Sequence, residues 1–144
     1  MSEFLWPVRV YWEDTDGGGV VYYANYLRYL ERARTEWLRT LGYSQRELAH
    51  DPGLIFTVIA LEIEYRRPAR LDDALLVSCT PRREGAASVS FAQEIHRAQS
   101  AAARPGELVA SARVRVACVD ARSFRPQRLP DFLLNALPKA QEPV

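Results

Sequence analysis

Residues 11–42, YWEDTDGGGVVYYANYLRYLERARTEWLRTLG, join an acidic cluster and three glycines to the clearest helical pattern in the chain. Its apolar residues recur every three or four positions, which is the spacing of one helix face. They are Leu27, Leu30, Ala33, Trp37, Leu38 and Leu41. The pattern predicts a helix over residues 26–41, about 24 Å long, with Asn25 as its cap and Gly42 just past its end. Such a helix would pack its apolar face against a sheet.

Two further patterns flank this helix. Residues 5–12 are rich in β-forming side chains and predict a first strand, in which Pro7 suits an edge position. After the helix, Ser44 and Glu47 have the spacing of a capping box, which predicts a short helix that ends near His50. The long helix is therefore expected between a strand and a second, shorter helix.

The rest of the chain has the two-residue period of β-strands. Apolar residues alternate with polar ones from Ile55 to Arg66, which predicts a long strand with one buried face. Three more strands are expected, beginning near residues 75, 88 and 107. A tail from about residue 125 is expected to be extended, apart from a short helix at 131–136.

Acidic or glycine-containing turns separate the predicted strands, at 71–73, 84–85 and 105–106. Short turns of this kind favour antiparallel pairing in a meander over parallel crossovers. One long helix ahead of several long strands predicts an α+β fold, in which a curved antiparallel sheet wraps around the helix.

The composition is that of an ordinary globular protein. We expect one domain over residues 1–144, because single domains usually hold roughly 100–200 residues. No stretch approaches the roughly 18 apolar residues of a membrane helix, so no integral membrane segment is expected. The net charge of +1 argues against nucleic acid as a partner. The first residues lack the pattern of a secretory signal, which predicts a soluble, cytoplasmic protein.

No metal site is expected. Cys79 and Cys118 stand alone in apolar runs, without CxxC spacing or nearby histidines, and they predict buried free thiols. The acids Glu13, Asp14 and Asp16 lack the later glutamate that completes a calcium loop.

The acidic cluster admits a structural and a catalytic interpretation. Glu13 and Asp14 are best explained as turn formers that bond to the backbone nearby. Asp16 precedes a Gly-rich turn and a helix N-terminus, whose free N–H groups would stabilise an oxyanion beside a carboxylate. A carboxylate in that position can attack an acyl group or activate water. The spacing is therefore compatible with acyl transfer to water.

The stretch RVYWEDTDGGGVVYYANYLRYLERARTEWLR resembles the signature of hotdog-fold acyl-CoA thioesterases. The likeness is to the 4-hydroxybenzoyl-CoA thioesterase group and its YbgC-type branch, associated with the Tol-Pal envelope system. It continues through EYRRPARLDD and VRVACVD at near-constant spacing. The resemblance implies a hotdog fold, a homodimer that joins two sheets or a homotetramer of paired dimers, and an active site between protomers.

The same resemblance implies two catalytic positions. Asp16 would be the nucleophile or general base, and the N–H of Tyr23 would polarise the thioester carbonyl. Many YbgC-type sequences have His where this chain has Tyr23, so a role for a His side chain does not carry over. Glu31 is a weaker alternative, because an ion pair or hydrogen bond with Arg28, Arg34 or Thr35 accounts for it.

Further residues are expected to contact the substrate. The glycines at positions 17–19, among them Gly19, would let the acyl group approach the backbone. Tyr22, Tyr26 and Trp37 would shape its pocket. Asn25, the expected cap, is also a candidate contact. Phosphates of coenzyme A are expected to bind arginines, which suit such groups. The candidates are Arg66, Arg67 and Arg70, and Arg82 and Arg83 at the next turn.

The expected function is hydrolysis of an acyl-CoA or acyl-carrier-protein thioester, without a cofactor. Attack by Asp16 through a mixed anhydride and activation of water remain open alternatives. A hotdog dehydratase is the enzymatic alternative, although the His base that it usually needs is absent from the expected loop. The remaining alternative is a non-catalytic acyl-thioester binding or envelope-associated scaffold protein.

Overall fold

The computed structural model describes residues 3–99 and 104–138. Its elements, in chain order, are β1 (Leu5–Arg9), the 3-10 helix η1 (Trp12–Asp14), α1 (Asn25–Thr40), α2 (Gln45–His50), β2 (Leu54–Tyr65), β3 (Ala74–Ser78), β4 (Thr80–Arg83), β5 (Ser88–Gln99), β6 (Arg104–Asp120) and α3 (Asp131–Ala136). The predicted long helix, the capped short helix and the helix at 131–136 are confirmed.

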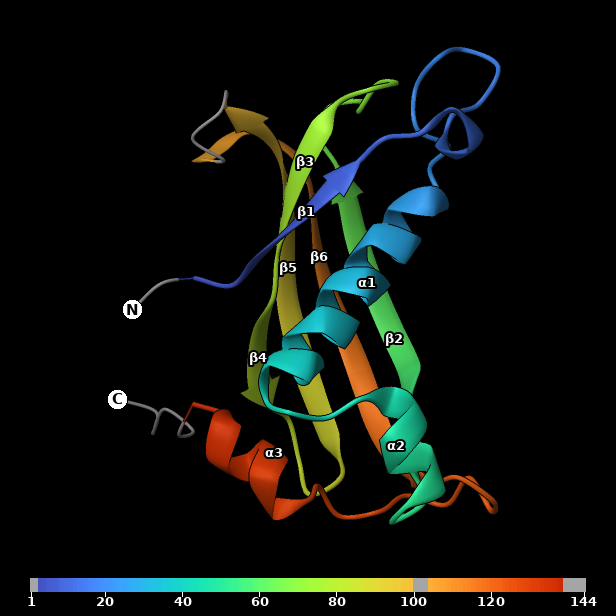
Figure 1. Cartoon of the computed structure of the whole chain (residues 1–144), viewed down its shortest axis with the longest axis vertical. Coiled ribbons are helices and arrows are strands. Elements are labelled where there is room, and N and C mark those ends of the chain that lie inside the picture. The colour runs from blue at the N-terminus through green and yellow to red at the C-terminus, as the bar shows by residue number, and fades with distance from the viewer. Residues whose placement is uncertain (1–2, 100–103, 139–144) are drawn as a thin grey trace.

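The described strands form one antiparallel sheet in the order β1-β3-β5-β6-β2, and β4 pairs with β5 beside β3. Antiparallel pairing was expected, but a simple meander is wrong, because β2 lies at the edge opposite β1 (Figure 1). Only β4, β5 and β6 follow one another as neighbours. The chain between β2 and β3 therefore passes two strands, β6 and β5, before it rejoins the sheet.

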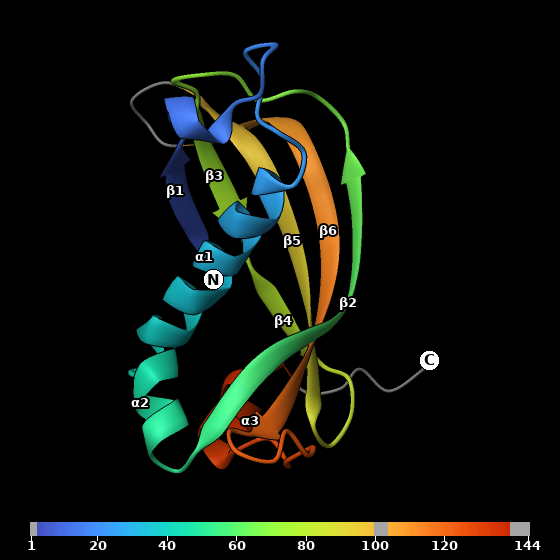
Figure 2. The ribbon, with the colours of Figure 1, turned by 90° about the vertical axis from the view of Figure 1, so that its right-hand side faces the viewer.

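The sheet curves around α1, as Figure 2 shows. The face of α1 that points to the sheet is buried and apolar, with Tyr29, Leu30 and Ala33 at 1% exposure or less. Opposite them lie alternate residues of β3, β5 and β6, such as Val77, Ile95 and Val114. Burial of side chains of this size contributes about 1.5–3 kcal/mol each. The predicted α+β arrangement, a sheet wrapped around a long helix, is confirmed.

Three element boundaries differ from the prediction. The first strand ends at Arg9, and Trp12 lies in η1 with 79% of its surface exposed. The strand expected from residue 75 is divided at Cys79 into β3 and β4. The expected turn at 105–106 lies within β6, where Gly106 packs so closely that a Cβ would come within 2.8 Å of the Arg97 carbonyl oxygen.

Asn25 is the first residue of α1 and does not cap it, contrary to the prediction. Ala24 occupies the cap position, and no side chain accepts a hydrogen bond there. The Asn25 side chain instead donates from Nδ2 to the carbonyl oxygen of Asp14 at 2.9 Å. Asn25 therefore links the helix start to the acidic cluster.

The alternating pattern of β2 predicted one buried face, and the structure leaves much of that face exposed. On it, Ile59 is 52% exposed, Tyr65 is 46% exposed and Leu61 is 38% exposed. Two features account for this: β2 is an edge strand that, in the described part of the chain, pairs with β6 alone, and its register shifts between Val58 and Ala60. An apolar edge strand of this kind is normally covered by another surface.

The cap of α2 provides a first test of the fold. The Ser44 hydroxyl accepts a hydrogen bond from the Glu47 N–H at 3.2 Å. Ser44→Ala is expected to lower the free energy of unfolding by about 1 kcal/mol, as measured by urea denaturation. Ser44→Asn, which preserves an accepting side chain, should restore most of the loss; equal losses in both variants would contradict the capping role.

Candidate active site

The acidic cluster folds into a small hairpin at the N-terminal end of α1. Thr15 and Val21 form an antiparallel bridge, and the Asp16 N–H donates to the Val20 carbonyl at 2.8 Å. Gly19 turns the chain with a positive φ of 81°, which glycine adopts without strain. The Val21 N–H donates to the Ala69 carbonyl at 2.8 Å, so the hairpin is tied to the segment that follows β2.

Asp14 holds the base of this hairpin, as expected for a turn former. Its buried carboxylate accepts a hydrogen bond from the Tyr11 N–H at 2.9 Å. Its carbonyl accepts two more, from the Tyr22 N–H and from Asn25 Nδ2, both at 2.9 Å. Burial is the main cause that raises the pKa of the Tyr29 hydroxyl, and the Asp14 carboxylate raises this pKa further. Asp14 is thus occupied by structural contacts, whereas Glu13 is exposed.

Asp16 is exposed at the hairpin turn. Its Oδ1 accepts a hydrogen bond from the Gly18 N–H at 2.7 Å. Within the described part of the chain, no group donates to Oδ2. A Cβ at Gly18 would lie 3.2 Å from Oδ1, so a small residue there leaves room beside the carboxylate. One carboxylate oxygen is therefore oriented by the backbone and the other is available for chemistry.

Tyr23 closes the hairpin just before α1. The Tyr22 carbonyl accepts a hydrogen bond from the Asn25 N–H at 2.8 Å. Because C=O and N–H point in opposite directions across a trans peptide, the Tyr23 N–H points away from the helix. Among residues 3–99 and 104–138, no acceptor is bonded to this N–H. It has the properties required of an oxyanion donor.

Four tyrosines surround the helix start. The rings of Tyr22 and Tyr23 lie 4.8 Å apart, and Tyr65 packs against Tyr23 at 6.4 Å and Tyr26 at 5.4 Å. Tyr26 is buried, and its hydroxyl accepts a hydrogen bond from the Ala69 N–H at 3.0 Å. Partial burial raises the pKa of the Tyr65 hydroxyl, so this group remains a protonated donor at neutral pH.

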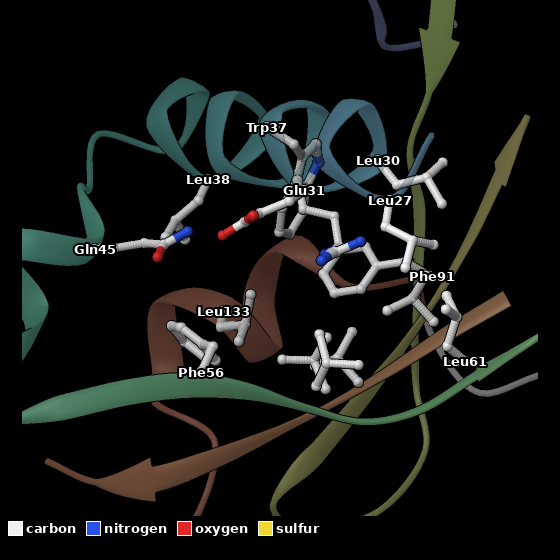
Figure 3. Close-up of a pocket in the computed structure, with 15 residues that line it drawn as sticks. Leu27, Leu30, Glu31, Trp37, Leu38, Gln45, Phe56, Leu61, Phe91 and Leu133 are labelled. Atoms are coloured by element: carbon white, nitrogen blue, oxygen red, sulfur yellow. The ribbon is translucent and has the colours of Figure 1, made fainter. Parts of the chain in front are cut away.

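A cavity of about 290 Å³ lies between α1 and the sheet (Figure 3). Trp37 lines it, as expected of a pocket residue, whereas Tyr22, Tyr26, Asp16 and Tyr23 do not. The lining is mainly apolar and comes from α1, three strands and α3: Leu27, Leu30, Trp37, Leu38, Phe56, Val58, Leu61, Val89, Phe91, Val114, Val116 and Leu133. The sequence did not predict this cavity, because its lining residues have the apolar pattern of any buried core. Only the folded sheet shows that they surround a cavity.

Polar groups also reach this cavity. Glu31 lines it and points toward Gln45 in Figure 3. The ion pair or hydrogen bond expected for Glu31 is not formed within the described residues. Arg34 instead donates to Oε1 of the buried Gln93 at 2.9 Å, and Gln93 Nε2 donates to the Leu30 carbonyl at 3.1 Å. Burial lowers the pKa of Arg34.

The candidate phosphate-binding arginines fall into two separate groups. Arg66 pairs with Glu64 at 2.6 Å and Arg67 with Glu107 at 3.4 Å, both just beyond the hairpin end of β2. Arg82 and Arg83 lie in β4, opposite Ser90 and Val89. Tyr65, the last residue of β2, pairs with Ala110 of β6, and Ala110 also pairs with Ile95 of β5. The two groups are therefore offset by five residues along the strands, about 17 Å, and are also separated by three strand spacings of about 4.8 Å each across the sheet.

Both cysteines are buried free thiols, as predicted. Burial raises the pKa of Cys79 to about 12 and also raises the pKa of Cys118. Only the thiolate is reactive, so the native protein is expected to react very slowly with Ellman's reagent at pH 8. Unfolding in guanidinium should expose two thiols per chain; rapid reaction of the native protein would contradict the burial.

Residues 3–99 and 104–138 lack two features. No three His, Cys, Asp or Glu side chains gather there to share a metal ion. Nor does any helix in these ranges have the length and hydropathy of a membrane span.

The chain belongs to the thioesterase-like superfamily, because the model of this family matches residues 10–137. It is 43% identical over 127 residues to the acyl-CoA thioesterase YbgC of Haemophilus influenzae, and the alignment covers 88% of each chain. It is also 43% identical over 131 residues to the acyl-CoA thioester hydrolase YbgC of Escherichia coli O157:H7, covering 91% of this chain and 92% of the relative.

Solved structures give the same result. A 1,4-dihydroxy-2-naphthoyl-CoA thioesterase from Synechocystis superposes with a TM-score of 0.84 at 27% identity, covering 99% of this chain and 100% of the other. A probable thioesterase from Bartonella henselae superposes with a TM-score of 0.80 at 33% identity, covering 90% of this chain and 100% of the other. The expected hotdog fold is confirmed.

Proposed function

We propose that the protein is an acyl-CoA thioesterase in which Asp16 and the Tyr23 N–H act on the thioester carbonyl. The observation that carries this proposal is the hairpin: at one end of α1 it holds a carboxylate oxygen and an N–H that have no partner among the described residues, in a chain of the thioesterase-like superfamily. The relatives named as acyl-CoA thioesterases support coenzyme A as the carrier.

The reaction can start from Asp16 in two ways. Its carboxylate either takes a proton from water, which attacks the carbonyl carbon, or attacks that carbon itself and forms a mixed anhydride. In both cases the Tyr23 N–H donates to the oxygen that becomes negative, and collapse breaks the C–S bond to release coenzyme A as a thiolate, which takes up a proton. In the second route, water then hydrolyses the anhydride and restores Asp16. One oxyanion donor is typically worth about 2.7–4 kcal/mol of barrier.

The mainly apolar lining of the cavity under α1 supports binding of an apolar acyl group there, as one part of the substrate. Val58 and Leu61 of β2 form part of the cavity wall, and both residues are also exposed to solvent. The glycines of the hairpin, Gly19 included, leave the backbone accessible beside Asp16. Arg66 and Arg67 lie just beyond the C-terminal end of β2, and Arg82 and Arg83 lie in β4. The phosphates of coenzyme A can bind either group.

The proposal is tested by coenzyme A release from a panel of short, long and aromatic acyl-CoAs, followed with a thiol-reactive dye. Turnover of one class is expected, and the inert protein thiols should add no background. Saturable binding measured by calorimetry, with no release on any member of the panel, would favour a non-catalytic acyl-thioester binding protein.

We further propose a homodimer that pairs two β2 strands, and pairing of such dimers into a tetramer. The exposed apolar residues of β2, with Ile59 at 52%, support such an interface. The two free thiols fit the cytoplasm as the compartment. The family match over residues 10–137 supports one functional domain.

The proposed interface predicts the effect of a charge in β2. Ile59→Asp is expected to give a species near the protomer mass of 16.4 kDa in light scattering, because paired carboxylates would be buried. Phe124→Asp is the matched control, since Phe124 is 63% exposed and lies outside the sheet. An unchanged oligomer in Ile59→Asp would exclude this interface.

A further inference from the structure

The backbone on both sides of Tyr23 is held by hydrogen bonds. On the N-terminal side, the Tyr22 carbonyl accepts from the Asn25 N–H at 2.8 Å, and the Tyr22 N–H donates to the Asp14 carbonyl at 2.9 Å. These contacts are local and lie within the hairpin and the first turn of α1. They fix the Tyr22–Tyr23 peptide, which contains the Tyr23 N–H, but not the Tyr23–Ala24 peptide that follows it.

On the C-terminal side, the Tyr23 carbonyl accepts a hydrogen bond from the Tyr65 hydroxyl at 3.0 Å. Within residues 3–99 and 104–138, no other donor is bonded to this carbonyl. Tyr65 is the last residue of β2 and lies opposite Ala110 of β6, so its backbone belongs to the sheet. The contact joins residues that are 42 positions apart in the chain.

The ring of Tyr65 is oriented by its neighbours. It packs edge-on against Tyr23, with an interplanar angle of 86°, and it is tilted against the buried Tyr26. Aromatic pairs at these separations are favourable beyond simple burial. The hydroxyl therefore reaches the Tyr23 carbonyl from a side chain with few alternative positions, although 46% of the residue is exposed.

We propose that Tyr65 is a positioning residue that aims the Tyr23 N–H at the thioester carbonyl by holding the Tyr23 carbonyl through its hydroxyl. The inference rests on the proposed function, because the Tyr23 N–H must be the oxyanion donor. With the Tyr23–Ala24 peptide fixed by Tyr65 and the Tyr22–Tyr23 peptide fixed by Asn25, both torsions of Tyr23 are determined. An oxyanion donor contributes most when its direction is set before the reaction begins.

The first test is Tyr65→Phe, which keeps the ring contacts and removes only the hydroxyl. A neutral hydrogen bond of this kind corresponds to about a three- to tenfold fall in kcat, and KM should change less than twofold. Tyr43→Phe is the matched control, because the Tyr43 ring stacks on Phe132 at 3.7 Å in another part of the core. The control should keep wild-type kcat, and thermal melts should show both variants folded.

A second readout separates positioning from a general structural effect. Two unreactive substrate analogues are compared as inhibitors: a ketone with CH₂ in place of the thioester sulfur, and a thioether with CH₂ in place of the carbonyl. Tyr65→Phe should weaken the ketone more than the thioether, since only the ketone presents a carbonyl to Tyr23.

The possible outcomes are distinct. Equal weakening of both analogues, or wild-type kcat in Tyr65→Phe, would overturn the positioning role while leaving thioesterase activity intact. If the wild-type protein releases coenzyme A from no acyl-CoA, the proposed function fails and this inference falls with it.

Discussion

Asp16→Ala is expected to lower kcat for acyl-CoA hydrolysis by about 10²–10⁴-fold, because the carboxylate that starts the reaction is removed. KM should change little, since Asp16 acts on the carbonyl carbon and, within the described residues, its carboxylate accepts a single hydrogen bond, from the Gly18 N–H. The measurement is steady-state release of coenzyme A, with purified variants compared at equal folded concentration.

Glu13→Ala is the control for this experiment. Glu13 is an exposed acid three positions before Asp16, so the substitution removes the same charge from the same motif. It should retain kcat within about twofold. Activity of Asp16→Ala within threefold of the wild type would remove Asp16 from the reaction.

Gln93→Met is expected to lower the free energy of unfolding by about 3 kcal/mol. Gln93 is 1% exposed and connects three groups: Arg34 Nη1, the Leu30 carbonyl and the Ser78 carbonyl. Methionine has a similar shape but leaves the Arg34 guanidinium without the amide oxygen that it contacts. Urea denaturation measures the loss.

A double variant makes this prediction specific. Arg34→Met combined with Gln93→Met removes both partners, so its loss should be smaller than the sum of the two single losses. Gln45→Met, at an exposed glutamine, should change stability by less than about 0.5 kcal/mol. Additive losses in the double variant would contradict the coupling between Arg34 and Gln93.

Local patterns were sufficient for most elements. The period of apolar residues identified α1, and the Ser44 hydroxyl, spaced three residues before Glu47, identified the start of α2. Each of these signals depends on residues within one or two turns of chain. The order of the strands did not follow from them, because the pairing of β2 with β6 joins Leu54 to Asp120 across half the sequence.

The same limit applies to the site. The acidic motif pointed to Asp16, and the resemblance to hotdog-fold thioesterases pointed to Tyr23; both lie in one short stretch. Contacts between distant segments carried no sequence signal: Tyr65 with the Tyr23 carbonyl, and Arg34 with Gln93, are 42 and 59 positions apart. Asn25 was assigned to a cap because its type suits one, but the carbonyl of Asp14 competes for its side chain and binds it.

The most direct test of the proposed site is a crystal structure of Asp16→Asn with an intact acyl-CoA. Asparagine preserves the shape of the side chain and removes the carboxylate, so the thioester should survive. We expect the thioester carbonyl oxygen to lie about 3 Å from the Tyr23 nitrogen, with its carbonyl carbon beside residue 16. A thioester bound away from the hairpin, with its carbonyl turned from Tyr23, would contradict the proposed site.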